Sequence, residues 1–211
     1  ADIIIVNTCS VREKAAQKAY SQLGRLKKFK KKNPELIMGV AGCLAQEHKS
    51  EFLRRAPYLD FVLGTHNIHH ITRIIEEIRF GTDRIVDTSF QSSVRSLGIR
   101  VLPPAGKVSA FVTIMQGCNN FCSYCIVPYV RGREESRASA DIIDEIRFLA
   151  GGGVREVVLL GQNVNSYGSG LTEDIDFSTL LRMINDIEEI ERVRFTTSHP
   201  KDLSDKLASC F

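Results

Sequence analysis

The stretch SAFVTIMQGCNNFCSYC, residues 109–125, places three cysteines directly after an apolar run. The run has the composition of a strand that is buried in a parallel sheet. Cys118, Cys122 and Cys125 follow it with the spacing C-x3-C-x2-C. A zinc site usually draws its four ligands as two separated pairs, whereas a compact triplet can hold three irons of a cubane iron-sulfur cluster and leave the fourth open. The stretch therefore predicts a strand that delivers a metal-binding loop, with a zinc knuckle or unrelated buried thiols as the alternative.

The composition of the chain is that of a globular protein. Of the 211 residues, 43% are hydrophobic and 25% are charged, which is enough to bury a core. No apolar run approaches the roughly 18 residues that cross a bilayer, and no signal peptide is recognisable. A net charge of +3 makes no case by itself for nucleic acid. We expect a cytoplasmic protein, without a membrane partner, whose cysteines serve metal binding or catalysis.

The first part of the chain alternates between strand and helix patterns. Apolar runs predict strands at residues 1–8, 36–41 and 60–63. Helical periodicity follows each run, at residues 11–32, 46–55 and 68–78. Ser10 and Glu13 fit a capping box at the start of the first helix. Alternating strands and helices predict a parallel, Rossmann-like α/β domain.

Two cysteines of this part occupy matching positions. Cys9 and Cys43 each stand at a predicted turn from a strand to a helix. In open α/β sheets ligands bind outside the carboxyl ends of the strands, so the two thiols could converge on one site. Taken alone, each would more often be a small buried core residue. Cys210 shares neither feature, and we interpret it as structural.

The sequence becomes rich in serine, glycine and proline after the first three strand-helix patterns. We place the first domain at residues 1–89, a linker at 90–107 and a second domain at 108–211. The second domain shows three successive strand-helix patterns, with further strands at residues 156–160 and 192–197. A closed parallel barrel typically needs more than about 200 residues, so three units predict an incomplete barrel. We expect the chain to be a fragment of a longer protein at both ends.

Polar residues follow the predicted strands of the second domain. Gln162 and Asn163 come directly after one strand and His199 follows the next, where functional groups of such barrels lie. Arg131, Arg133 and Arg137 form a basic cluster after the cysteines. Their guanidinium groups could clamp a phosphate, or they could form a surface network with Glu134 and Glu135.

These motifs resemble a known family. The C-x3-C-x2-C loop with Tyr124 before its last cysteine, after the first strand of a βα barrel, is similar to that of the radical S-adenosylmethionine enzymes. Further stretches narrow the resemblance to the methylthiotransferases, and within them to the branch that acts on isopentenylated adenosine in tRNA. They are NTCSVREK at residues 7–14, Gly42-Cys43, IVPY at 126–129 with RGRE at 131–134, and LGQNVN at 160–165.

The resemblance implies two 4Fe-4S clusters and S-adenosylmethionine. Cys118, Cys122 and Cys125 would hold the cluster that binds and cleaves S-adenosylmethionine, and the resulting radical would take hydrogen from C2 of the adenosine. A second cluster on three amino-terminal cysteines, two of them Cys9 and Cys43, would deliver a sulfur that carries a methyl group. The first of these three lies on a strand that this chain lacks, so we expect the fragment itself to be inactive.

The resemblance also implies contacts and partners. The residues expected to contact S-adenosylmethionine are Tyr124, Gln162, Asn163 and His199, and those expected to contact substrate are Arg131, Arg133 and Arg137. The partners would be a tRNA anticodon stem-loop and an electron donor such as flavodoxin or ferredoxin. Within the same chemistry, the substrate could instead be threonylcarbamoyladenosine in tRNA or an aspartate of a ribosomal protein. From another class, the chain could be a non-catalytic metal-binding RNA module.

Overall fold

The computed structural model describes residues 1–90 and 106–211. Its contacts divide the chain into two compact units, Ala1–Ser93 with Phe121–Gly132, and Val94–Asn120 with Arg133–Phe211. The second half of the cysteine motif therefore packs with the amino-terminal residues. In the described part of the chain, no helix is both long and apolar enough to cross a membrane.

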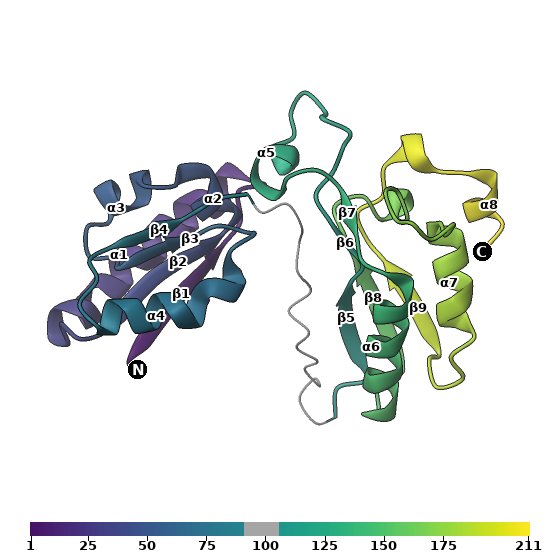
Figure 1. Cartoon of the computed structure of the whole chain (residues 1–211), viewed down its shortest axis with the longest axis horizontal. Coiled ribbons are helices and arrows are strands. Elements are labelled where there is room, and N and C mark those ends of the chain that lie inside the picture. The colour runs from purple at the N-terminus through teal and green to yellow at the C-terminus, as the bar shows by residue number, and fades with distance from the viewer. Residues whose placement is uncertain (91–105) are drawn as a thin grey trace. The chain divides into compact units, whose positions relative to one another are not determined.

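A parallel sheet forms the centre of the first unit. Its strands are β1 (Ile3–Thr8), β2 (Ile37–Gly42), β3 (Phe61–Leu63) and β4 (Ile85–Asp87), and they lie side by side in that order (Figure 1). The register pairs Thr8 with Gly42, so that β1 and β2 end at the same level. The central strand β2 is almost fully buried because helices cover both faces.

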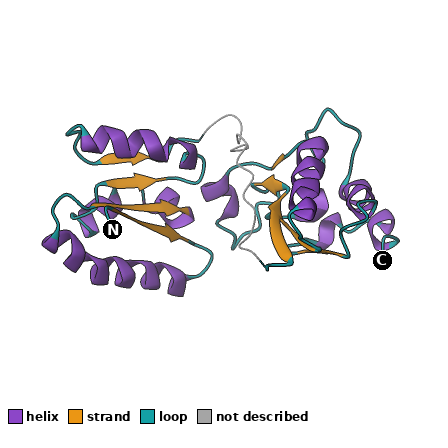
Figure 2. Ribbon diagram, turned by 90° about the horizontal axis from the view of Figure 1, so that it is seen from below, coloured by secondary structure: helices purple, strands orange, loops and turns teal. Residues whose placement is uncertain are grey.

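The helices of this unit divide between the two faces of the sheet. They are α1 (Glu13–Lys32), α2 (Cys43–His48), α3 (Glu51–Arg55), a 3-10 turn (Ile68–His70) and α4 (Ile71–Arg79). Leu23 of α1 and Phe52 of α3 pack with Met38 and Val40 in one core. On the opposite face, Ile74 of α4 packs with Ile37 and Phe61. Figure 2 shows helices above and below these strands.

Two local predictions for this unit are wrong. The capping box is absent, because Arg12 is the extended residue before α1 and no side chain caps its amino terminus. The single helix expected over residues 46–55 is two helices, because Lys49 has a positive φ of 48° that ends α2. The parallel α/β architecture itself is confirmed.

The second unit is built on three parallel strands in the order β5-β8-β9. These are β5 (Ser109–Thr113), β8 (Glu156–Leu160) and β9 (Arg192–Phe195). The helices are α6 (Ser139–Gly151), α7 (Phe177–Asn185) and α8 (Asp205–Ala208), with 3-10 turns at Val164–Ser166 and Pro200–Asp202. Val112, Val157 and Ile146 belong to one core between the sheet and its helices. Consecutive parallel strands with helices on one face fit the first units of the expected barrel.

A short pair of strands flanks the segment that carries the cysteine motif. β6 (Met115–Gln116) and β7 (Glu135–Ser136) are antiparallel, and Gln116 pairs with Glu135. Between them, α5 (Val127–Arg131) follows the last cysteine. Sequence periodicity predicted neither α5 nor the β6-β7 pair. The strand pair holds together the two ends of the segment formed by residues 117–134.

Candidate functional site

Gln162 holds the residue that precedes the first cysteine of the motif. The side-chain Oε1 of Gln162, just beyond the end of β8, accepts a hydrogen bond of 2.7 Å from the backbone N–H of Gly117. Gly117 has a positive φ of 78°, a conformation that favours glycine. Gln162 therefore fixes the position from which Cys118 enters the loop.

Asn163 connects the end of β8 to the segment that follows β9. It is only 2% exposed. Its Nδ2 donates to Asp202 Oδ2 at 2.7 Å, and its Oδ1 accepts from the backbone N–H of His199 at 3.1 Å. The same Asp202 oxygen accepts from Asn120 Nδ2 at 3.4 Å. Asn163 and Asp202 thereby tie the cysteine loop to two strand ends.

Glu134 completes a closed set of hydrogen bonds between the cysteine loop and the residues that follow β8. Its backbone N–H donates to Asn119 Oδ1 at 3.2 Å. Its side-chain Oε2 lies 2.7 Å from Ser166 Oγ, which is 2.9 Å from the carbonyl oxygen of Asn163. We call this set the polar ring, and its members are Asn119, Asn120, Glu134, Asn163, Ser166 and Asp202. Sequence reasoning missed its role because its bonds join residues far apart in the chain.

The polar ring favours a proton on Glu134. A serine hydroxyl has one proton, yet Ser166 Oγ faces both the Glu134 carboxyl and the Asn163 carbonyl. Glu134 Oε1 is buried and has no hydrogen-bond partner among the described residues. Burial raises the pKa of Glu134 above its ordinary value of 4.5; the hydrogen bond from Ser166 opposes this rise, and the charge of Asp202 adds to it. A protonated Glu134 can donate to Ser166, which then donates to Asn163.

Replacing Glu134 by glutamine should remove a pH dependence of stability. Because the folded-state pKa is raised, the folded protein binds more protons than the unfolded chain above pH 4.5, and stability falls as pH rises through the raised value. The Glu134→Gln variant stays neutral, so its free energy of unfolding relative to the unmodified protein should increase over that range. Urea unfolding from about pH 4 to pH 8 measures this difference. Glu188→Gln, at an exposed position, is the control; parallel curves for Glu134→Gln and the unmodified protein would contradict a raised pKa.

The other predicted residues of this unit have varied surroundings. Arg137 forms an ion pair of 2.7 Å with Glu145 and donates to the carbonyl oxygen of Thr113 at 2.6 Å, so its guanidinium group links β5 to α6. His199 Nδ1 accepts from the backbone N–H of Lys201 at 3.2 Å and caps the 3-10 turn that follows. Arg133 is exposed. Their roles toward cofactor or substrate stay predictions.

Cys9 and Cys43 come directly after a paired position of the first sheet. β1 and β2 end at Thr8 and Gly42, which lie opposite each other. Thr8 Oγ1 donates to the carbonyl oxygen of Ala41 at 2.6 Å and accepts from the backbone N–H of Ala45 at 3.3 Å. Gly42 has a φ of 97°, and a Cβ there would collide with the backbone of Thr8. These constraints bring the two cysteine-bearing turns to one edge of the sheet, as predicted.

Cys43 has an arginine neighbour that sequence reasoning did not anticipate. Cys43 is buried, whereas Cys9 is exposed. Arg131 Nε donates to Cys43 Sγ at a distance of 3.3 Å. Both residues belong to the first unit, although they are 88 positions apart.

The loop of the triplet carries thiols suited to an iron-sulfur cluster. All six cysteines of the chain are thiols. Cys125 donates its backbone N–H to the carbonyl oxygen of Cys122 at 2.9 Å, which makes this end of the motif a tight turn with the 90% exposed Tyr124 inside it. Within residues 1–90 and 106–211, no three His, Cys, Asp or Glu side chains are already gathered so that they could hold a metal ion. The fit to a cluster therefore rests on the donor set, three thiols in one loop.

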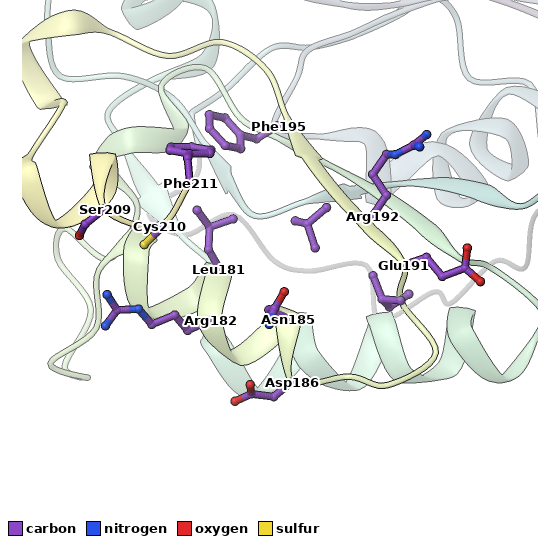
Figure 3. A pocket seen from close by; sticks show the side chains of 12 residues that line it. Leu181, Arg182, Asn185, Asp186, Glu191, Arg192, Phe195, Ser209, Cys210 and Phe211 are labelled. Atoms are coloured by element: carbon purple, nitrogen blue, oxygen red, sulfur yellow. The ribbon is translucent and has the colours of Figure 1, made fainter.

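One cavity of the second unit lies away from all of these residues. It has a volume of about 590 Å³ and is lined by residues of α7, β9 and the last residues of the chain. Figure 3 shows Leu181, Phe195 and Phe211 around it, with Cys210 nearby. Cys210 Sγ lies 3.3 Å from the carbonyl oxygen of Lys206. None of the predicted site residues lines this cavity.

Comparison with known families assigns the two parts of the chain separately. Residues 1–64 match the model of an uncharacterized protein family, UPF0004. Residues 112–209, which include the cysteine triplet and the polar ring, match the model of the radical SAM superfamily. Almost half of the chain, with all three cysteines of the motif, therefore resembles the radical SAM superfamily.

Three curated relatives of the chain carry the same name. The chain is 59% identical to a protein of Syntrophus aciditrophicus, 53% to one of Geobacter metallireducens and 49% to one of Syntrophotalea carbinolica, over its whole length in each case. All three are named tRNA-2-methylthio-N(6)-dimethylallyladenosine synthase. The chain spans about half of each relative, 46 to 48% of its length.

Two solved structures share the fold of this chain. Two structures of the radical S-adenosylmethionine methyltransferase TsrM from Kitasatospora setae superpose with TM-scores of 0.62 and 0.64. In both cases the aligned region includes 99% of this chain and 46% of the methyltransferase chain. The sequence identities are 13 and 12%, respectively. One contains cobalamin and a 4Fe-4S cluster, and the other tryptophan and an analogue of S-adenosylmethionine. At this identity the likeness concerns the fold.

Proposed function

We propose that the protein containing this chain is a tRNA methylthiotransferase that adds sulfur and a methyl group to C2 of N6-isopentenyladenosine beside the anticodon. The observation that carries the proposal is the identity of 49 to 59%, across every part of the chain, to relatives named for that product. The match extends over both cysteine-bearing regions, the turns after β1 and β2 and the loop after β5.

The cysteine triplet would hold the first cofactor. Cys118, Cys122 and Cys125 would bind a 4Fe-4S cluster with an open iron for S-adenosylmethionine. When bound, such a cluster supplies the electron that cleaves the sulfonium group. Cys9 and Cys43, at the edge of the first sheet, would contribute to the second 4Fe-4S cluster.

The chain's own residues would position this loop and the cosubstrate. Gln162 fixes Gly117, and the polar ring restrains Asn119 and Asn120 on the other side of Cys118. Asn163 keeps one N–H and one lone pair beyond its two short bonds, which could contact S-adenosylmethionine. His199 and Tyr124 are the further candidates for this contact.

The expected macromolecular partners follow from this activity. A tRNA anticodon stem-loop would be the substrate, and Arg133 and Arg137 are candidates for phosphate contacts. A flavodoxin or ferredoxin would supply electrons. A reaction on tRNA with these donors would take place in the cytoplasm.

Anaerobic iron-sulfur reconstitution of the full-length protein tests the proposal. We expect about four irons for each cluster and an electron paramagnetic resonance signal of the reduced protein that changes when S-adenosylmethionine is added. Zinc in place of iron, or a signal indifferent to S-adenosylmethionine, would support a non-catalytic metal-binding module instead.

Product analysis of the same protein identifies the substrate. Isopentenylated tRNA should gain the methylthio group, whereas threonylcarbamoylated tRNA and a ribosomal protein should not. Modification of either alternative in preference to isopentenylated tRNA would contradict the proposed branch.

A further inference from the structure

The segment that carries Cys122 and Cys125 is anchored within the amino-terminal unit. Residues 121–132 run from the middle of the cysteine motif through α5, which lies against α2. Thr65 Oγ1 donates to the carbonyl oxygen of Val130 at 2.6 Å, and His66 Nε2 lies 3.0 Å from the carbonyl oxygen of Arg131. These two residues follow β3 after Gly64, so the end of α5 lies at the carboxyl edge of the first sheet.

Thr65 and His66 act as a cap for α5. The last carbonyl groups of a helix have no partner within the helix. A carbonyl oxygen only accepts, so Nε2 of His66 must carry a proton, and its Nδ1 is buried without a hydrogen-bond partner among the described residues. The two contacts thus satisfy the carbonyl groups of Val130 and Arg131 from outside the helix.

Gly132 makes room for this cap. It ends α5 with a φ of 78° and a ψ of −168°, a backbone conformation that essentially only glycine adopts. A Cβ at this position would lie 3.3 Å from His66 Nε2. The glycine between Arg131 and Arg133 therefore has a local role in seating α5, separate from any contact of the two arginines.

The side chain of Arg131 reaches the cysteine of the first sheet. Its Nε is 3.3 Å from Sγ of Cys43, which is 5% exposed. Cys43 is the first residue of α2, so α5 contributes a donor at the point where β2 becomes α2. A guanidinium N–H directed at a ligand sulfur is the kind of outer contact that orients a metal ligand and tunes the metal.

We propose that Arg131 is a positioning residue for the amino-terminal cysteine site and that α5 couples this site to the segment carrying Cys122 and Cys125. The effect of Arg131 on a cluster rests on the proposed function, because it requires Cys43 to be a cluster ligand. The anchoring of residues 121–132 does not. This role differs from the phosphate contact that the sequence predicted for Arg131.

The first arm of the test uses the metal-free full-length protein. Amide hydrogen exchange followed by mass spectrometry reports the anchoring of residues 121–132. Thr65→Val removes one hydroxyl without changing shape, and Arg131→Met removes the guanidinium donor while keeping an unbranched side chain. Loss of one buried hydrogen bond should speed exchange in this segment about fivefold or more. Arg25→Met, at an exposed position of α1 in the same unit, is the matched control and should leave the rate unchanged.

The second arm uses the reconstituted full-length protein. Arg131→Met should weaken retention of the cluster at the amino-terminal cysteines about 10- to 100-fold toward an iron chelator. It should also shift the reduction potential of that cluster to more negative values, because a hydrogen bond to the sulfur is lost. Arg131→Lys keeps the positive charge but lacks the planar guanidinium group. Its cluster retention and reduction potential should therefore both differ from those of the unmodified protein.

The outcomes separate this proposal from the proposed function. If Arg131→Met changes neither hydrogen exchange, cluster retention nor potential, the positioning role is wrong. If the unmodified protein binds no iron, the proposed function fails, while the exchange arm still decides whether α5 is anchored. A change in exchange together with an unchanged potential would show that Arg131 anchors the segment but does not act on a cluster, which also overturns the proposal.

Discussion

Replacing Cys122 by alanine in the full-length protein will remove about four iron atoms per chain after reconstitution and abolish reductive cleavage of S-adenosylmethionine. A cubane cluster with one open iron needs all three thiolates of the loop, so loss of one leaves no stable site. Iron analysis and detection of 5′-deoxyadenosine measure the two effects.

Cys210→Ala is the matched control, because it removes a thiol that lies outside the cysteine motif. Its sulfur contacts carbonyl groups of Lys206 and Ser178 beside the cavity of Figure 3. Iron content and cleavage should match those of the unmodified protein. Loss of cleavage in this variant, or full iron content in Cys122→Ala, would show that the assignment of ligands is wrong.

Asn163→Ala will destabilise the second unit by about 3 kcal/mol. The change removes a buried side chain together with its hydrogen bonds to the half-buried backbone N–H of His199 and to Asp202, which keeps only the longer bond from Asn120 at that oxygen. Each lost bond to a desolvated group costs about 1–3 kcal/mol. It also opens the polar ring that restrains Asn119 and Asn120. Urea unfolding measures the loss, and Asn185→Ala, at an exposed position of α7, is the control.

Asn163→Asp distinguishes the polar ring from simple packing. The variant keeps the shape of the side chain but places a second carboxylate at the position that is 2.7 Å from Asp202. Two negative charges at this distance repel each other, so the variant should be less stable than the unmodified protein near neutral pH. Its free energy of unfolding should rise again as the pH falls to about 5 and one carboxylate takes up a proton. A loss of stability that is independent of pH would contradict this electrostatic reading.

Buried strands were predictable because their sequences carry the signal of burial. Residues 36–41 were expected as a strand and the structure has β2 at Ile37–Gly42, a segment covered on both faces. Short elements had no such signal. β6 and β7 contain two residues each and exist only because they pair with each other, so periodicity could not reveal them.

The capping box shows why a motif can mislead. Ser10 and Glu13 have the spacing of a reciprocal cap, but the helix begins at Glu13, with Arg12 as the residue before it. Ser10 is therefore two positions too early, and its hydroxyl is buried without a partner among the described residues. The spacing of Ser10 and Glu13 correctly indicated that a helix starts here, but the residue at which it starts was wrong.

The polar residues of the site were only partly predictable. Gln162 and Asn163 follow a recognisable strand, so their place at its end could be expected. Glu134 and Asp202 follow no pattern, because their importance comes from meeting Ser166 and Asn120 across 32 and 82 positions of sequence. The contact between Arg131 and Cys43 was hidden for the same reason.

The return of residues 121–132 to the first unit has a consequence for dividing this protein into parts. Expression of residues 106–211 alone would leave the end of α5 without Thr65 and His66, and expression of residues 1–90 alone would leave Cys43 without Arg131. A cut at the linker would therefore sever native hydrogen bonds of both products. The boundary between the two sequence motifs therefore does not coincide with the boundary between the two structural units, because residues 121–132 pack with the first unit.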